Sequence, residues 1–132
     1  MLEMFGCPPA VLDCPDRVRQ ALRDAAEAAK ATLLHETSHR FEPQGVTALG
    51  LLAESHISVH TWPELGYAAA DIFTCGEHTL PEAACHLLVE RLEATRYELR
   101  KVPRGVESPA VRPARAPVIP FVEPKDRAAG AG

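Results

Sequence analysis

The chain has few aromatic residues, no excess of positive charge and no long apolar run. Aromatic residues make up 5% of its 132 residues, and the formal net charge is −4. Its lysines and arginines are scattered, which argues against a nucleic-acid partner. No apolar run approaches the roughly 20 residues that cross a bilayer, and the N-terminus lacks the pattern of a secretory signal. We therefore expect a single-domain cytoplasmic protein with no membrane or nucleic-acid partner.

The four cysteines also lack a pairing pattern. They stand at positions 7, 14, 75 and 85 with no C-x-x-C spacing, so we interpret them as reduced thiols. Cys75 precedes a glycine at the predicted end of a strand, a position that suits a proton donor or nucleophile. On composition alone, a small buried hydrophobic residue is the simpler interpretation of Cys75. Cys85 lies beside leucines of a predicted helix and is expected to pack there.

Hydrophobic periodicity predicts two helices and six strands. The helices are expected over 13–31 and 79–94, and the strands over 2–6, 31–41, 46–54, 55–62, 67–76 and 95–102. Thr79 and Glu82 have the T-x-x-E spacing of a capping box. This order predicts an α+β two-layer sandwich, in which an antiparallel sheet carries two helices on one face. The other face of such a sheet is left open, so we expect dimerisation sheet to sheet.

The composition changes at Pro103. Residues 103–132 hold six of the 12 prolines and show neither helical nor strand periodicity. We therefore expect a folded domain over residues 1–102 and a proline-rich disordered tail over 103–132.

Two chemical interpretations receive little support from the residues alone. His56 and His60 are four apart on a predicted strand, as are His35 and His39, so either pair shares a face and could bind a metal. No third ligand is placed nearby by spacing, and we expect no metal site. Ser55 lacks the G-x-S-x-G context of a hydrolase nucleophile.

The segment from Leu51 to Gly76 reads LLAESHISVHTWPELGYAAADIFTCG, and residues 38–47 read SHRFEPQGVT. Both closely resemble the prokaryotic S-adenosylmethionine decarboxylase proenzymes of the short, pyruvoyl-dependent type. The resemblance extends from about residue 2 to residue 101. It implies the same two-layer fold and a dimer of αβ protomers, with sites near the interface and no need for metal or putrescine.

This resemblance gives the Glu54–Ser55 bond a chemical meaning. The Ser55 hydroxyl would attack the carbonyl of Glu54, and the chain would separate into a β chain of residues 1–54 and an α chain of residues 55–132. Ser55 would become the pyruvoyl cofactor, which forms a Schiff base with S-adenosylmethionine and serves as the electron sink for decarboxylation. A strained peptide at this position would ease the attack.

Five further residues take roles by resemblance. His60 matches the proton acceptor of processing, and Thr47 lies where the family usually has a serine that assists it. Cys75 matches the catalytic proton donor. Phe41 matches an aromatic that stacks on adenine, and Glu64 a carboxylate that holds the ribose hydroxyls.

Three other functions remain as alternatives to S-adenosylmethionine decarboxylation for spermidine biosynthesis. A pyruvoyl-dependent arginine or ornithine decarboxylase would use the same fold, but it would need neither Phe41 nor Glu64. A non-cleaving regulatory homologue would have no chemical need of all four of the residues Glu54, Ser55, His60 and Cys75. A metal-dependent hydrolase would use the histidines instead.

Overall fold

Six strands form one sheet in the order β2-β3-β4-β5-β1-β6, with every neighbouring pair antiparallel. The computed structural model describes residues 1–105. The strands are β1 (Leu2–Phe5), β2 (Leu33–Arg40), β3 (Val46–Leu52), β4 (Ser55–Trp62), β5 (Tyr67–Phe73) and β6 (Arg96–Leu99). The helices are α1 (Pro9–Leu12), α2 (Pro15–Ala28), α3 (Pro81–Arg91) and the short 3₁₀ helix η1 (Pro63–Leu65).

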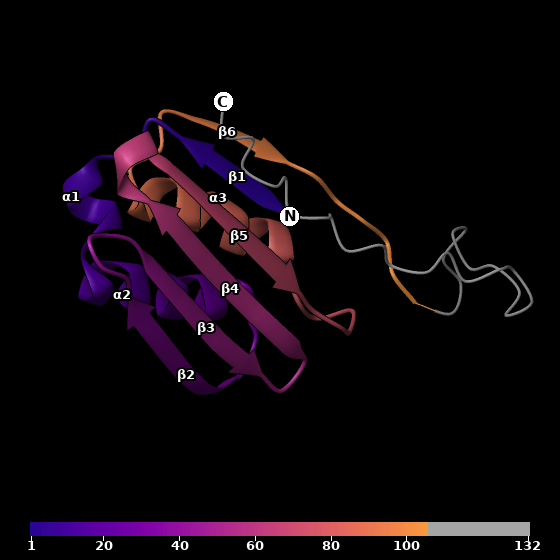
Figure 1. Ribbon diagram of the computed structural model, residues 1–132. Coiled ribbons are helices and arrows are strands. Elements are labelled where there is room, and N and C mark those ends of the chain that lie inside the picture. The colour runs from indigo at the N-terminus through magenta and orange to yellow at the C-terminus, as the bar shows by residue number, and fades with distance from the viewer. Residues whose placement is uncertain (106–132) are drawn as a thin grey trace, which may run out of the picture. The chain divides into compact units, whose positions relative to one another are not determined.

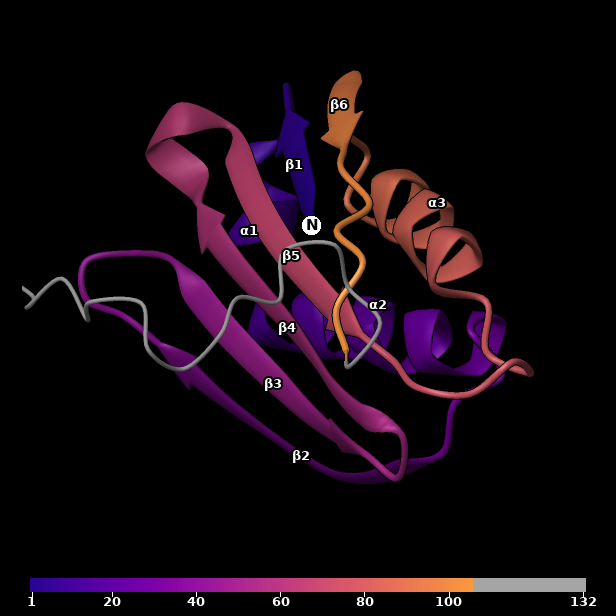
Figure 2. The same cartoon turned by 90° about the vertical axis from the view of Figure 1, so that its right-hand side faces the viewer.

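Helices α2 and α3 cover one face of the sheet and leave the other face open (Figures 1 and 2). The amphipathic pattern of α2 explains its position, because Val18, Leu22 and Ala25 share one face of the helix and are all buried. From α3, Ala84 and Leu88 enter the same core. The predicted α+β two-layer architecture is confirmed.

Alternation along the central strands determines which side chains reach the core. Ile57 and Val59 of β4 are buried under the helices, and His56, Ser58 and His60 alternate with them and therefore lie on the open face. Strand β3 behaves in the same way, so that Thr47, Leu49 and Leu51 share the open face with the β4 histidines. The open face thus carries both polar groups and large apolar side chains.

Two local features differ from the sequence prediction. The capping box is wrong: α3 begins after Leu80, the Thr79 hydroxyl donates to the Gly76 carbonyl, and Glu82 pairs with Lys101. Pro81 explains the start, because its fixed φ and missing N–H suit the first turn of a helix. Helix α1 was not predicted, because four residues are too few to show helical periodicity.

Residues Met1–Val102 form one compact unit. The predicted disordered tail lies, apart from residues 103–105, outside the described residues. Every helix within residues 1–105 is too short or too polar to span a bilayer.

The edge strand β2 is joined to α2 by a carboxylate that binds two guanidinium groups. Glu36 accepts hydrogen bonds from Arg19 at 2.7 Å and from Arg23, and its side chain is 17% exposed. The bond from Arg23, with a smaller contribution from Arg19, lowers the pKa of Glu36 to about 2. The ionised carboxylate therefore stabilises the folded chain at every pH at which Glu36 is also ionised in the unfolded chain.

Replacing Glu36 by Gln should lower the free energy of unfolding at pH 7 by about 1–2 kcal/mol, after allowance for solvent screening of the arginines. Because the pKa of Glu36 is lowered in the folded chain, the loss of unfolding free energy relative to wild type should be complete above pH 4.5. It should vanish as the pH falls to about 2. Urea unfolding at several pH values measures it, with Glu27→Gln on the exposed side of α2 as control. A difference independent of pH would contradict the assignment.

Candidate active site

The Glu54–Ser55 bond lies in the tight turn between β3 and β4. Leu52 pairs with Ser55, so Ala53 and Glu54 form a two-residue hairpin turn. The Ala53 N–H donates to the carbonyl of Thr32 at 2.9 Å and fixes the turn against the segment before β2. Ser55 itself has a φ of 155°, a value that residues with a Cβ rarely adopt. The backbone is therefore strained at Ser55, the residue that directly follows the bond for which strain is predicted.

The Glu54 side chain is held on both sides. The Thr32 N–H donates to Oε2 at 3.0 Å and the Thr32 hydroxyl to Oε1 at 3.3 Å. The bond from the Thr32 amide is the main cause that lowers the pKa of Glu54, with a smaller contribution from His78. His78 Nε2 lies 3.5 Å from Oε1 and belongs to the segment between β5 and α3, which also carries Cys75. Hence the turn and the Cys75 segment are in contact.

The cysteines differ sharply in exposure. Cys75 is exposed, whereas Cys7 and Cys85 are buried. Burial raises the pKa of both buried thiols to about 11, which makes them poor nucleophiles. The interpretation of Cys75 as a small buried residue is wrong, because the strand ends at Phe73 and leaves Cys75 in the following turn. Cys85 packs in the core as predicted.

Thr47 and His60 form a hydrogen-bonded pair at the opposite end of β4. The two residues face each other across β3 and β4, with the Thr47 hydroxyl oxygen 2.9 Å from His60 Nδ1. Both are half-buried on the open face of the sheet. This bond occupies Nδ1 and leaves Nε2 of His60 directed away from Thr47.

Phe41 and Glu64 lie close to this same end. The Phe41 N–H donates to the Gly45 carbonyl at 2.8 Å, and the exposed Phe41 ring meets the His39 ring edge to face at 4.8 Å. Gly45 has a φ of 102° and approaches the end of β4 so closely that a Cβ there would lie 3.0 Å from the Thr61 carbonyl oxygen. Glu64 follows in η1 and is exposed.

Residues that sequence reasoning missed support these positions. Asp13 accepts hydrogen bonds from the Gly45 N–H at 3.0 Å and from Arg40 at 2.9 Å. Those two bonds, the backbone one first, lower the pKa of Asp13. Asp13 precedes α2 and is far from Gly45 in sequence, so no local pattern signals the contact. Thr32 and His78, the partners of Glu54, were missed for the same reason.

The predicted site residues thus fall into two groups. Glu54, Ser55 and the Cys75 segment lie at one end of β4, and the Thr47–His60 pair lies at the other with Phe41 and Glu64. His60 is five residues from Ser55 along an extended strand, or about 16 Å at roughly 3.3 Å per residue. Within one chain, the fold does not bring His60 into contact with Ser55.

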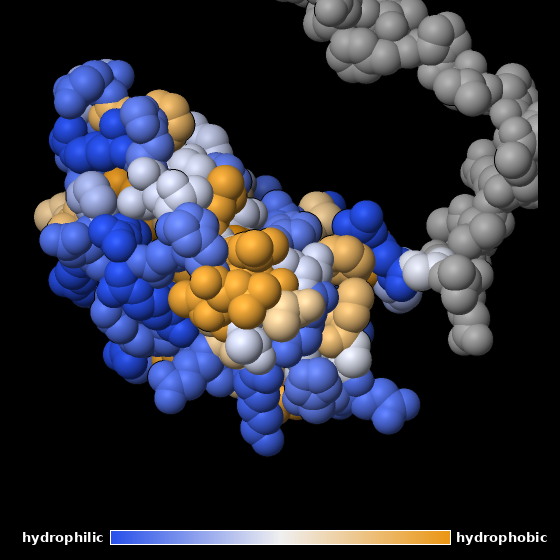
Figure 3. All heavy atoms as spheres, turned by 90° about the horizontal axis from the view of Figure 1, so that it is seen from below, coloured by the Kyte–Doolittle hydropathy of each residue, from blue (hydrophilic) through white to orange (hydrophobic). Residues whose placement is uncertain are grey.

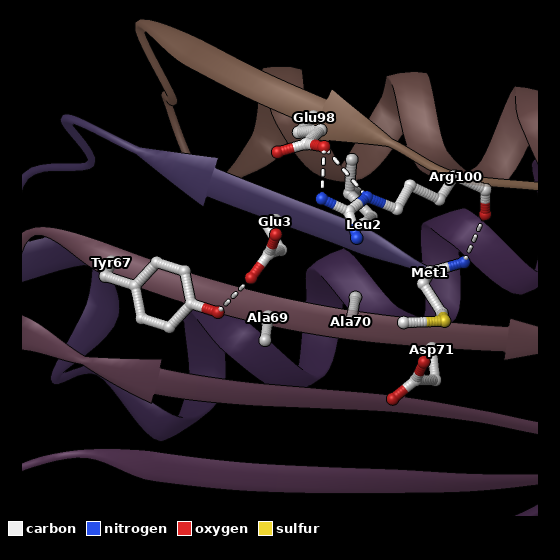
Figure 4. Close-up of a pocket in the computed structure, with 9 residues that line it drawn as sticks. All are labelled: Met1, Leu2, Glu3, Tyr67, Ala69, Ala70, Asp71, Glu98 and Arg100. Atoms are coloured by element: carbon white, nitrogen blue, oxygen red, sulfur yellow. Dashed lines mark hydrogen bonds and ion pairs between the residues drawn. The ribbon is translucent and has the colours of Figure 1, made fainter.

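A pocket of about 180 Å³ opens elsewhere, over β1, with β5 on one side and the end of β6 and the residue after it on the other (Figure 4). Its lining includes Glu3, whose carboxylate accepts a hydrogen bond from Tyr67 at 3.1 Å, and the paired Glu98 and Arg100. None of the predicted site residues lines it. Residues 1–105 contain no group of three or more side chains arranged to hold a metal ion.

Comparison with known proteins shows the family of this chain. Residues 1–105 match the family model described as S-adenosylmethionine decarboxylase. The S-adenosylmethionine decarboxylase proenzyme of Parasynechococcus marenigrum (strain WH8102) is 52% identical over 118 residues, covering 89% of this chain and 92% of that one. The proenzyme of Methanococcus vannielii is 47% identical over 106 residues, covering 80% and 87%.

A solved structure agrees with this. The crystal structure of the adenosylmethionine decarboxylase from Aquifex aeolicus VF5 superposes with a TM-score of 0.75 at 30% identity, covering 85% of this chain and 92% of that one. Fold and hairpin define an α+β decarboxylase of the proenzyme class. The chain belongs to the S-adenosylmethionine decarboxylase family, in the short type found in bacteria and archaea. The predicted family and enzyme class are confirmed.

The exposure of the cysteines predicts their reactivity in the folded protein. Iodoacetamide at pH 8 should alkylate Cys75 at least about tenfold faster than Cys7 or Cys85, because Cys75 is exposed to the reagent, whereas burial shields the other two thiols and raises their pKa. Peptide mass mapping over time measures the rates, and the denatured chain, in which all four cysteines should react, is the control. Equal rates in the folded protein would contradict the structure.

Proposed function

We propose that the chain cleaves itself between Glu54 and Ser55 and then converts S-adenosylmethionine to decarboxylated S-adenosylmethionine and CO2 for spermidine biosynthesis. The observation that carries the proposal is a serine with a φ of 155° at the end of a two-residue turn, in a chain of this family. The products would be a β chain of residues 1–54 and an α chain of residues 55–132.

The cleavage follows from the residues at the turn. The Ser55 hydroxyl attacks the Glu54 carbonyl and the peptide nitrogen is released, which relieves the strained backbone and leaves an ester. A base removes the Cα proton of residue 55, the Cβ–Oγ bond breaks, and Glu54 leaves as a carboxylate. Addition of water to the remaining dehydroalanine releases ammonia and leaves a pyruvoyl group. Serine suits this route to a pyruvoyl group because its oxygen first attacks the carbonyl and then leaves with the acyl group.

The pyruvoyl group supplies the electron sink that accepts the electrons of the broken carboxyl bond. Cys75 then donates a proton to the substrate α carbon. The exposed thiol and its contact through the segment of His78 to the Glu54 turn support this role. Nothing in the assigned chemistry calls for a metal.

An exposed aromatic ring and a nearby carboxylate support a nucleoside substrate. Phe41 offers a π face for adenine, and Glu64 offers two acceptors for the ribose hydroxyls. Arginine or ornithine needs neither group, and the relatives described above carry the S-adenosylmethionine name, so that alternative is not favoured. The presence of Ser55, His60 and Cys75 together argues against a non-cleaving regulatory homologue.

The separation of the two residue groups leads us to propose a homodimer of αβ protomers with shared sites. His60 of the same chain is about 16 Å from Ser55 along β4, too far for proton transfer, which needs hydrogen-bond distance or one bridging water. Two open sheet faces stacked with opposite strand directions would place the Ser55 end of one chain opposite the His60 end of its partner. Each site would then take Ser55 and Cys75 from one chain and Thr47, His60, Phe41 and Glu64 from the other.

The open face has the composition of such an interface. Leu49, Leu51 and Trp62 are 43%, 55% and 39% exposed on it, a set of apolar side chains that a partner would cover. Seen from the β2 side, the molecule has a mostly hydrophilic surface with one group of apolar side chains (Figure 3). We further propose a cytoplasmic location, a catalytic domain of residues 1–102 and a disordered tail of residues 103–132.

Replacing Ser55 by Ala should leave one uncleaved chain with no decarboxylase activity, because the attacking hydroxyl is gone. Cys75→Ala should still cleave but release CO2 at least about tenfold more slowly. Intact mass under denaturing conditions and CO2 release from labelled S-adenosylmethionine measure the two steps separately. Cleavage of the Ser55→Ala chain would overturn the mechanism, and normal turnover by Cys75→Ala would remove that thiol from its role.

Shared sites predict cleavage in trans. Neither Ser55→Ala nor His60→Ala should cleave alone, but after co-expression about half of the His60→Ala chain should be cut, because chains associate at random and a mixed dimer contains one complete site. Chains with different tags allow the products to be distinguished by mass. The control partner is the double variant Ser55→Ala/His60→Ala, which should leave the His60→Ala chain intact. If the His60→Ala chain stayed intact with the Ser55→Ala partner as it does with the control partner, the shared site would be overturned.

A further inference from the structure

We infer that His78 is a positioning residue for the proposed reaction: after cleavage it binds the carboxylates of Glu54 and holds the segment that carries Cys75 next to residue 55. The inference rests on the proposed function and extends it to a residue with no role assigned above. Its basis is the contact of 3.5 Å between His78 Nε2 and Glu54 Oε1, at the bond where the chain is to be cut.

The segment between β5 and α3 is shaped to present His78. Gly76 has a φ of 97°, which favours glycine, and a Cβ there would lie 2.9 Å from Cε1 of the His78 ring and would displace the imidazole from this position. The Thr79 hydroxyl donates to the Gly76 carbonyl at 3.0 Å and closes the turn. The Leu80 N–H donates to the Ala29 carbonyl at 2.9 Å and fixes the far end of the segment. Cys75 lies directly before this turn.

Cleavage changes the charge that His78 faces. In the intact chain Glu54 has one carboxylate, and a single ion pair to a histidine with 63% exposure contributes little. When the Cβ–Oγ bond of residue 55 breaks, the serine oxygen stays with Glu54 as part of a new terminal carboxylate. Residue 54 then carries two negative charges, which strengthen a charge-assisted hydrogen bond from a neighbouring imidazole. His78 should therefore bind more strongly after cleavage than before it.

The contact also crosses the cleavage boundary. Glu54 is fixed to Thr32, at 3.0 Å from its amide, and both belong to the β chain. His78 and Cys75 belong to the α chain. The new end of the β chain thus stays in place and serves as an anchor for the thiol segment. Restricting Cys75 in this way would favour proton delivery to the substrate carbon rather than to residue 55, where misdirected protonation leaves alanine.

Hydrogen exchange of residues 74–80, followed by mass spectrometry, tests the anchor without measuring activity. In the cleaved protein, His78→Ala should exchange this segment about 3- to 10-fold faster than wild type, because the segment opens more often. In the uncleaved Ser55→Ala background the same substitution should change exchange less than about twofold. His78→Lys, which offers an ammonium donor in place of the imidazole, should restore protection, and Glu77→Ala, the exposed neighbour, is the matched control.

A second measurement is the fraction of α chain with alanine at residue 55 after a fixed number of turnovers, read from intact mass. It should rise several-fold in His78→Ala and stay at the wild-type level in Glu77→Ala. Equal exchange in His78→Ala and Glu77→Ala, with wild type fully cleaved, would overturn the inference alone. A wild-type chain that stays uncleaved would overturn the proposed function and this inference with it.

Discussion

The register of β3 against β4 is the constraint on which the site depends. Leu52 opposite Ser55 leaves only Ala53 and Glu54 for the turn, and the same pairing places Thr47 opposite His60. A shift of one residue would send the hydroxyl and imidazole groups to the helix-covered face. The register is secured because Ile57 and Val59 must be buried under α2 and α3. Hydrophobic burial on one face therefore determines the chemistry available on the other.

The strained turn and the polar open face have different structural support. Strain at Ser55 is maintained by the hairpin itself and by Thr32, which holds both the Ala53 amide, through its carbonyl, and the Glu54 side chain. The Thr47–His60 pair is supported by the regular ladder of two central strands and needs no strain. Asp13 stabilises the loop of Phe41 through Gly45 and Arg40. A rigid sheet thus carries two half-sites that meet only when two chains face each other, in the arrangement we propose.

Much of the fold could be predicted from the sequence because periodicity reports burial directly. Alternation at 55–62, for example, predicts β4, and the 3,4 spacing of Val18, Leu22 and Ala25 predicts α2. Local hydrogen bonding was less predictable. Thr79 and Glu82 have capping-box spacing, but Pro81 starts the helix later and each side chain finds another partner. The exposure of Cys75 could not be predicted either, because it depends on where β5 stops.

The sequence by itself determined the family and the fold class, and it identified the residues that we propose carry the chemistry, because motifs such as Glu-Ser and Thr-Cys-Gly are contiguous in the chain. Only the tertiary structure decided which of those residues meet. Glu54 is 22 residues from Thr32 and 24 from His78, yet it contacts both, whereas His60 is five residues from Ser55 and remains apart from it. The reason is geometric: an extended strand carries near neighbours in sequence far apart, and strand pairing with loop closure brings distant segments together.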